Sequence, residues 1–364
     1  MRRGSIHGRA SFDGASRSRN GDIMIPQEKI AAVTQGLREA FGAADFTDIC
    51  KITGGLSSDL VFRIIVRGSP YLLRVMTHID ERNDPVRHFT CVQIAAEGGL
   101  APRVLHANTK DGILITDFVE AAPFSEGQAL TLIPATLAKL HALPPFPKAF
   151  NYVTAHNGFI WRFRTANLVA ASEIEDAFTR YHQVCAAYPR LDADIVSCHS
   201  DLKPENILFD GQRLWLVDWQ AAFLNDRYFD LAIVANFAIS SDADERSYLE
   251  AYFGQPPDEY QCARFFLMRQ VMHMFYAAVF LMLGFAGKPV NQDESLPSFR
   301  NYHERIWAGG VNLADLPTRI VYGRVHWEQL LKNLRQARFE EALHIVSDRH
   351  ADQVDFRPLL PAAP

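Results

Sequence analysis

Hydrophobic residues follow a strand-like spacing in the first third of the chain. Leu60, Phe62, Ile64 and Val66 occupy every second position, which is the spacing of a half-buried β-strand. A short turn then leads into a second apolar stretch at residues 71–76. Two helices are predicted in this part of the chain, one in "IPQEKIAAVTQGLREAF" and one over residues 84–97. Five strands are predicted, in "DICKITGGL", "LVFRIIVRG", "YLLRVM", "APRVLHA" and "DGILITDF".

The spacing becomes helical after about residue 125. Leu130, Ile133, Leu137 and Leu140 form one apolar stripe, and helical patterns continue to the end, interrupted by a turn at 210–211. We therefore predict an α+β protein in which a five-stranded antiparallel sheet with a helix precedes a larger, mostly helical half. The predicted divisions are a disordered tail at residues 1–23, an N-terminal lobe at 24–120, a C-terminal lobe at 121–346 and a loose tail at 347–364.

The most apolar run, residues 265–287, is interrupted by Arg269 and His273. Its uninterrupted part covers about 14 residues, whereas a bilayer-spanning helix needs about 20. We therefore predict a buried core helix and no membrane partner. The N-terminal tail has no apolar stretch behind its arginines, which argues against a secretory signal; an Arg/Ser-rich transit peptide is the alternative to disorder.

Composition narrows the class of protein further. The formal charge is −5, from 37 basic and 42 acidic residues, without a basic block, so a nucleic-acid partner is not expected. The 5 cysteines are scattered singly and form no metal-binding pattern. Free thiols in a reducing cytoplasm explain them better than disulfides do.

Polar residues interrupt an otherwise strand-like segment, "CHSDLKPENILFDGQRLWLVDW", at residues 198–219. A hairpin around Asp210-Gly211 would bring Asn206 and Asp218 to the same end of two paired strands. Their oxygens are hard ligands suited to Mg²⁺ and the phosphates of a nucleotide. Asp201, on the preceding loop, can accept or orient a hydroxyl proton. These are the working parts of phosphoryl transfer.

At these residues "HSDLKPEN" and "LVDW" resemble the catalytic loop and metal aspartate of kinase-like phosphotransferases. More narrowly they resemble the choline kinase and aminoglycoside phosphotransferase superfamily, in which a second aspartate precedes a Leu-Ala pair, here Asp230-Leu231-Ala232. "LAKLHALP", "GGLSSDLVFRI" and "TDFVE" also resemble superfamily segments, so the likeness covers roughly residues 45–240. It implies a two-lobed, protein-kinase-like fold that uses ATP and Mg²⁺.

The resemblance also implies roles for single residues. Asp201 would be the catalytic base, Asn206 and Asp218 the magnesium ligands, His199 a packing residue, and Asp230 the residue that holds the loop. Lys203 would supply positive charge to the γ-phosphate. The residues expected to contact ATP are Gly55, Ser57 and Ser58 over the phosphates, Arg74 at the phosphates, and Asp117, Phe118 and Val119 at the adenine.

Two positions depart from the superfamily pattern. The helix glutamate that pairs with the phosphate-binding cation is missing at residues 88–90, and Glu81 and Glu97, the possible substitutes, lie off the expected spacing. Gln220 stands where the superfamily has glutamate after Asp-Trp. A catalytically weak, nucleotide-binding regulator is therefore the alternative from another class. A protein kinase is disfavoured because Asp-Phe-Gly, Ala-Pro-Glu and GxGxxG are absent.

The acceptor is the least determined feature. A choline- or ethanolamine-like amino-alcohol is expected first, with an aminoglycoside or another small metabolite as the alternative. The acidic run at residues 240–260 would attract a cationic acceptor or would be a solvated helix face. Aromatic residues would form an ammonium cage or pack in the core; they are Trp161, Phe163, Tyr228, Phe237 and Trp307. The oligomeric state is left open.

Overall fold

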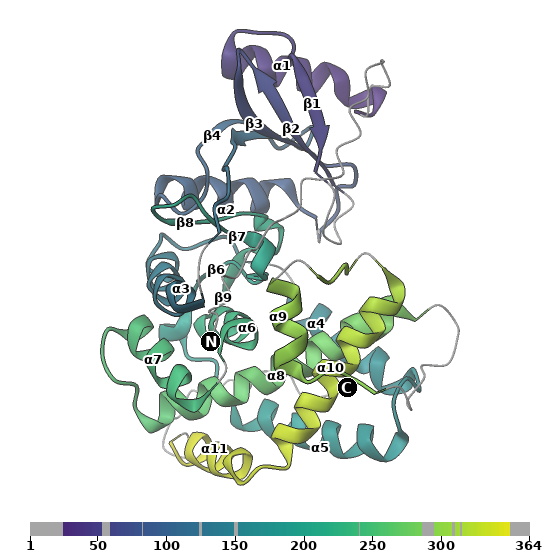
Figure 1. Cartoon of the computed structure of the whole chain (residues 1–364), viewed down its shortest axis with the longest axis vertical. Coiled ribbons are helices and arrows are strands. Elements are labelled where there is room, and N and C mark those ends of the chain that lie inside the picture. Colours follow the sequence, from purple (N-terminus) through teal and green to yellow (C-terminus); the bar gives the residue numbers. More distant parts are fainter. Residues whose placement is uncertain are drawn as a thin grey trace, which may run out of the picture.

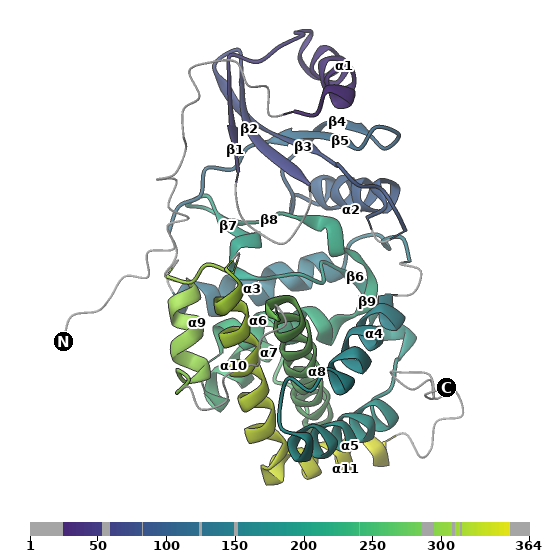
Figure 2. The ribbon, with the colours of Figure 1, turned by 90° about the vertical axis from the view of Figure 1, so that its right-hand side faces the viewer.

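The computed structural model describes residues 25–52, 59–81, 83–123, 126–148, 152–239, 241–285, 295–307, 310–313 and 315–349. The chain forms a small sheet-containing lobe and a larger helical lobe, drawn one above the other in Figures 1 and 2. We refer to the parts before and after residue 120 as the N-lobe and the C-lobe. The predicted N-terminal tail, residues 1–23, lies outside the described residues. So do residues 350–364 of the predicted C-terminal tail.

The N-lobe contains the five predicted strands in one sheet, with the order β1-β2-β3-β5-β4 and antiparallel neighbours throughout. The α+β class predicted from the spacing is therefore confirmed. Its elements are α1 (Ile30–Phe41), β1 (Asp48–Lys51), β2 (Leu60–Val66), β3 (Ser69–Val75), α2 (Pro85–Glu97), β4 (Val104–Asn108) and β5 (Ile113–Asp117).

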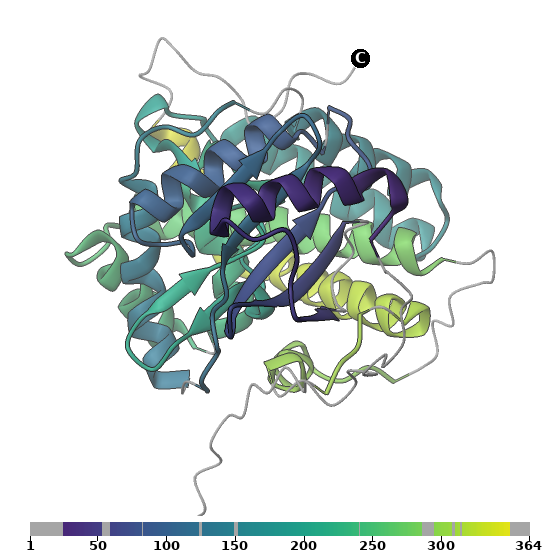
Figure 3. The same ribbon diagram turned by 90° about the horizontal axis from the view of Figure 1, so that it is seen from above.

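The alternation in β2 works as the sequence predicts. Phe62 and Ile64 are fully buried, together with Leu73 on β3 and Leu37 on α1. Seen from above, α1 lies over the sheet (Figure 3), while α2 lies on the side of the C-lobe. The Arg87 guanidinium on α2 donates to a backbone carbonyl of the C-lobe, so the two lobes are in direct contact.

The C-lobe is built mainly from helices around α8 (Figure 2). Its helices are α3 (Glu126–His141), α4 (Tyr152–Thr165), α5 (Ala171–Ala187), α6 (Arg227–Ala238), α7 (Asp242–Phe253), α8 (Glu259–Gly284), α9 (Phe299–Trp307), α10 (Leu316–Leu334) and α11 (Ala337–Asp348). Two short ribbons complete it, formed by β6 (Ile195–Cys198) with β9 (Phe223–Asp226) and by β7 (Ile207–Phe209) with β8 (Leu214–Leu216). Because α11 ends at Asp348, ordered structure continues past residue 346.

The apolar run forms α8, the core helix predicted from its interruptions. By length and composition α8 would suffice to cross a membrane, but 67% of its most apolar window is buried inside the protein. It crosses α10 closely, because a Cβ on Gly323 would lie 2.8 Å from the backbone nitrogen of Leu281. Only glycine fits this contact without a shift of the helices.

The predicted hairpin is formed by β7 and β8. Ile207 pairs with Leu216, and Gly211 makes the turn with φ of 98°. Backbone hydrogen bonds tie the hairpin to the N-lobe, from Leu216 N to Leu100 O at 2.8 Å, and to the segment that joins the lobes, from Ala122 N to Phe209 O at 2.6 Å. The hairpin therefore sits between the sheet and the helical lobe, as Figures 1 and 2 show.

Three buried histidines, His273, His303 and His326, pack together between α8, α9 and α10. Burial lowers the pKa of His303 to about 4 and those of His273 and His326 well below their usual value. The folded protein keeps these rings neutral at a pH at which the unfolded chain binds protons.

Stability should therefore fall as the pH falls from about 6.5 toward 4, by about 1.4 kcal/mol per pH unit for each neutral histidine. Urea unfolding at several pH values measures this dependence. His303→Phe should flatten this dependence by one histidine's share. The same slope in wild type and His303→Phe would contradict the assignment.

Candidate active site

The loop that carries Asp201 is held by a buried carboxylate. Asp230, in the first turn of α6, accepts hydrogen bonds from the backbone N–H groups of His199 (2.8 Å) and Ser200 (2.7 Å). Ser200 has a φ of 64°, a left-handed conformation that is unfavourable for a side chain other than glycine. The two bonds stabilise this bend, and the role predicted for Asp230 is confirmed.

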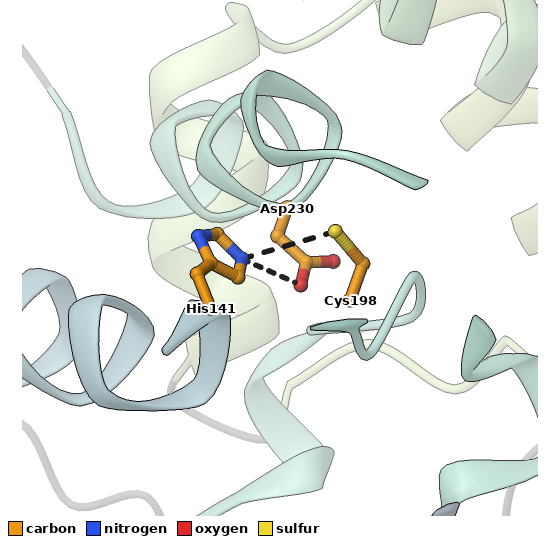
Figure 4. A group of neighbouring side chains, drawn as sticks. All are labelled: His141, Cys198 and Asp230. Carbon is orange, nitrogen blue, oxygen red and sulfur yellow. Dashed lines mark hydrogen bonds and ion pairs between the residues drawn. The ribbon is translucent and has the colours of Figure 1, made fainter. Parts of the chain in front are cut away.

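Asp230 also lies beside His141 and Cys198 (Figure 4). The ligand atoms of the three residues lie within 4.8 Å of one another, a spacing that a metal ion would tolerate. Their polar atoms are already engaged, because His141 Nδ1 contacts the Tyr252 hydroxyl at 2.6 Å and the Cys198 thiol donates to Asn225 O at 3.4 Å. Burial raises the pKa of Cys198 well above its usual value, so the sulfur stays a neutral thiol. We assign this group to the support of the loop.

His199 connects the loop to the end of the hairpin. Its Nε2 lies 2.9 Å from the carbonyl oxygen of Val217, and Asp201 N donates to its Nδ1 at 3.3 Å. The ring is fully buried against Trp219, with centroids 4.6 Å apart. These contacts fit the packing and orienting role that the sequence predicts for His199.

Asp201 remains accessible within this buried setting. Its side chain is 34% exposed, and Lys203 Nζ lies 3.4 Å from one carboxylate oxygen. Burial raises the pKa of Asp201, and the positive charge of Lys203 counteracts part of the rise. A carboxylate with a raised pKa is a better proton acceptor than an ordinary one, which is the property that a general base needs.

Asn206 lies next to Asp201, as the spacing predicts. Its amide nitrogen donates to the backbone carbonyl of Asp201 at 2.7 Å and to the carboxylate at 3.2 Å. In this orientation the amide oxygen accepts no hydrogen bond from the residues that the structure describes. Val217 N donates to Asn206 O at 3.0 Å, so the hairpin holds Asn206 beside the strand that leads to Asp218.

Asp218 follows β8 in a left-handed conformation, with φ of 65° and ψ of 63°. Arg74, on β3, donates from Nη2 to Asp218 Oδ1 at 2.8 Å and thereby joins the N-lobe to the C-lobe. Burial alone would raise the pKa of Asp218, but the positive charges of Arg74 and then Lys203 outweigh burial and lower the pKa. Asp218 is therefore an ionised oxygen donor.

Arg74 has a second carboxylate partner that sequence reasoning missed. Asp59, the residue before β2, lies 3.1 Å from Arg74 Nη1, and its side chain is fully buried. Glu97 is not a substitute for the absent helix glutamate, because it is exposed and accepts a hydrogen bond from Gln93. The helix instead presents His88, whose pKa is lowered by burial and then by Arg74. In the sequence, Asp59 is a single acidic residue within "GGLSSDLVFRI", and nothing in that segment marks it as a partner of Arg74.

The structure describes only some of the other residues that are expected to contact ATP. Gly55, Ser57 and Ser58 lie outside the described residues. Asp117 ends β5, where its carboxylate accepts a hydrogen bond from Arg103 at 3.1 Å, and Phe118 lies 5.2 Å below the Arg63 guanidinium. Val119 is half-buried in the segment that joins the lobes. Their contact with adenine stays a prediction.

Two residues of the acidic run at residues 240–260, Glu245 and Asp258, have structural roles. Glu245 is buried and pairs with Arg269 at 3.0 Å and with Arg338. Asp258 caps α8 through a hydrogen bond from Gln261 N. Of the aromatic residues singled out in the sequence, Phe163 and Tyr228 are buried in the core, and the side chain of Trp307 is outside the described part.

A different set of rings packs together on α6, α8, α9 and α10. Tyr322 on α10 stacks on Tyr302 with centroids 5.6 Å apart, and its pKa is raised by burial, by Tyr276 and by the charges of Glu205 and Asp201. No motif links these residues in the sequence. The aromatic cluster consists of Phe237, Tyr276, Phe280, Phe299, Tyr302, His303, Tyr322 and His326.

The chain that brings Asp201, Asn206 and Asp218 together has counterparts among known proteins. A model of the Phosphotransferase enzyme family matches residues 48–266. The chain belongs to this family. The family relationship confirms the superfamily predicted from the catalytic loop and the metal aspartate.

Individual family members are distant relatives. Protein LicA of Haemophilus influenzae is 24% identical over 213 residues, which cover 56% of this chain and 62% of LicA, so the match spans less than two thirds of that protein. A choline/ethanolamine kinase family protein from Mesorhizobium loti is similar in structure, with a TM-score of 0.60 and 20% identity over 86% of this chain and 98% of that one. Spectinomycin phosphotransferase in complex with ADP and spectinomycin has a TM-score of 0.50 and 12% identity, over 80% of this chain and 98% of that one. At these identities the structural likeness shows the fold.

Proposed function

We propose that the protein is an ATP- and Mg²⁺-dependent phosphotransferase that transfers the γ-phosphate to a hydroxyl of a small amino-alcohol such as choline or ethanolamine. The observation that carries the proposal is the convergence of Asp201, Asn206 and Asp218 at one end of the hairpin. Its free cysteines suit a reducing compartment such as the cytoplasm.

The residues at the hairpin fit a magnesium ion. Asn206 directs its amide nitrogen to Asp201, which leaves the oxygen as a donor, and Asp218 is kept ionised by Arg74 and Lys203. A side-chain carbonyl and a carboxylate are oxygen donors of the kind that Mg²⁺ binds together with nucleotide phosphates. A bound Mg²⁺ neutralises negative charge on those phosphates.

Each residue then has a distinct task. Asp201 accepts the proton of the acceptor hydroxyl, or orients that hydroxyl, because its carboxylate is accessible and its pKa is raised. Arg74, held in place by carboxylates, contributes fixed positive charge for phosphate oxygens. Lys203 lies beside the base and adds a second positive charge on the side of the C-lobe.

One comparison favours an amino-alcohol over other acceptors. The structural relative from Mesorhizobium loti is described as a choline/ethanolamine kinase family protein. The likeness to spectinomycin phosphotransferase keeps an aminoglycoside as the second candidate.

The regulator alternative loses part of its basis in this structure. It depended on a missing carboxylate for Arg74, and Asp59 supplies one.

ADP release by purified protein with Mg-ATP tests the proposal against choline, ethanolamine, spectinomycin, kanamycin and homoserine. We expect release that depends on choline or ethanolamine and is abolished by EDTA. Release that depends only on an aminoglycoside would replace the acceptor and keep the reaction. ATP binding without release for any acceptor would favour the regulator.

A further inference from the structure

The Asp59 carboxylate accepts hydrogen bonds from side chains of three separate segments. Arg74 Nη1 of β3 lies at 3.1 Å from its carboxylate, Asn83 Nδ2 of the segment before α2 lies at 3.3 Å, and Gln220 Nε2 of the C-lobe makes a short hydrogen bond to the oxygen that Arg74 also contacts. The Gln220 amide also reaches Asn83 Oδ1 at 3.3 Å. We infer that Asp59 and Gln220 form a coupled pair of positioning residues that fixes Arg74 for nucleotide phosphates.

The carboxylate is needed because Arg74 is buried. Its side chain is 8% exposed, and the charge of a buried guanidinium requires a partner. Arg74 uses Nη1 for Asp59 and Nη2 for Asp218, so two nitrogens of the rigid group are fixed at once. Asp59 thus does from the start of β2 what a helix glutamate would do from α2.

The same geometry explains why residue 220 is an amide. Gln220 donates to Asp59, and a glutamate there would place a second carboxylate within hydrogen-bond distance of a fully buried one. Like charges at this distance repel strongly where water is excluded. The carboxylate of Asp59 and the amide of Gln220 are therefore electrostatically matched to each other.

This pair also connects the lobes. Gln220 lies two residues after Asp218, whereas Asp59 and Arg74 belong to the N-lobe. The Gln220–Asp59 and Arg74–Asp218 contacts therefore cross the same boundary side by side.

The inference rests on the proposed function, since Arg74 serves phosphates only if nucleotide binds. The experiment measures KM for ATP, kcat and thermal unfolding for wild type, Gln220→Glu, Asp59→Asn and the double variant. We expect each single variant to raise KM for ATP at least about tenfold with a smaller change in kcat, and the double variant to return to within about threefold of wild type.

Two further variants separate charge from packing. Gln220→Met removes the donor without adding charge, and should raise KM for ATP less than Gln220→Glu does. Gln212→Glu adds the same charge at an exposed position of the hairpin turn and should change nothing.

The inference would be overturned if the two substitutions raised KM for ATP additively in the double variant. It would also be overturned if Gln220→Met and Gln220→Glu raised KM for ATP equally. Should the wild type show no turnover, the proposed function fails, while the thermal unfolding of the four proteins still reports whether Asp59 and Gln220 are coupled. Recovery of unfolding temperature in the double variant would support the pairing, and its absence would refute it.

Discussion

Asp201→Asn is expected to lower kcat by about 10²–10⁴-fold while the protein remains folded. The variant keeps the shape of the side chain but cannot accept a proton. Burial raises the pKa of Asp201, so the ionised carboxylate lowers the stability of the folded protein near neutral pH. Replacing the carboxylate with an amide should therefore not lower the unfolding temperature greatly. The measurement is kcat at saturating ATP and acceptor, with a thermal melt of the same sample.

Asp210→Asn is the matched control, because Asp210 belongs to the same segment but lies exposed at the hairpin turn. There its carboxylate accepts hydrogen bonds from the backbone N–H groups of Gln212 and Arg213. It should leave kcat within about twofold of wild type, since surface changes away from a site have small effects. An Asp201→Asn variant with kcat near that of the control would place the base elsewhere.

Arg264→Met is expected to lower the free energy of unfolding by about 3–5 kcal/mol. Arg264 is 2% exposed, pairs with Asp194 and with Asp226 at 3.2 Å, and lies between the rings of Tyr188 and Tyr228 at 4.9 and 4.5 Å. Methionine fills the space but removes the arginine partner of Asp226, whereas Asp194 keeps Arg227 Nε at 3.1 Å. Urea unfolding at neutral pH measures the loss.

The consequence should extend to the active site. Asp226 caps α6 through Tyr228 N at 2.9 Å, and α6 carries Asp230, which holds the catalytic loop. Arg246→Met, at an exposed position of α7, is the control for the exchange itself. A loss below about 1 kcal/mol for Arg264→Met would mean that the two carboxylates find other partners or water.

Local patterns predicted the parts of the site that depend on neighbouring residues. Asn206 and Asp218 converge because a tight turn at Gly211 forces β7 and β8 to pair, and both the turn and the strands are visible as spacing. Asp230 could be assigned because its position relative to the loop is a feature of the superfamily pattern. The core helix α8 was predicted because Arg269 and His273 interrupt its apolar run and leave too few uninterrupted residues to cross a bilayer.

Contacts between distant segments could not be predicted in this way. Asp59 and Gln220 are 161 positions apart, and only the packing of the two lobes shows that they meet. Asp59 therefore takes the place of the glutamate expected on α2, because electrostatics requires a carboxylate near Arg74 without specifying which segment carries it. The alternatives for the acidic run could not be separated for a similar reason: Glu245 has two arginine partners, from α8 and α11, that the sequence does not reveal.

The most direct test of the account asks where the γ-phosphate goes. Wild-type protein, Mg-ATP and choline or ethanolamine are incubated together, and the products are identified by mass spectrometry beside an Asp201→Asn reaction. The account predicts an acceptor that has gained one phosphoryl group, in an amount equal to the ADP formed, and none with the variant. ADP accompanied only by inorganic phosphate, or a phosphorylated acceptor produced equally well without Asp201, would contradict it.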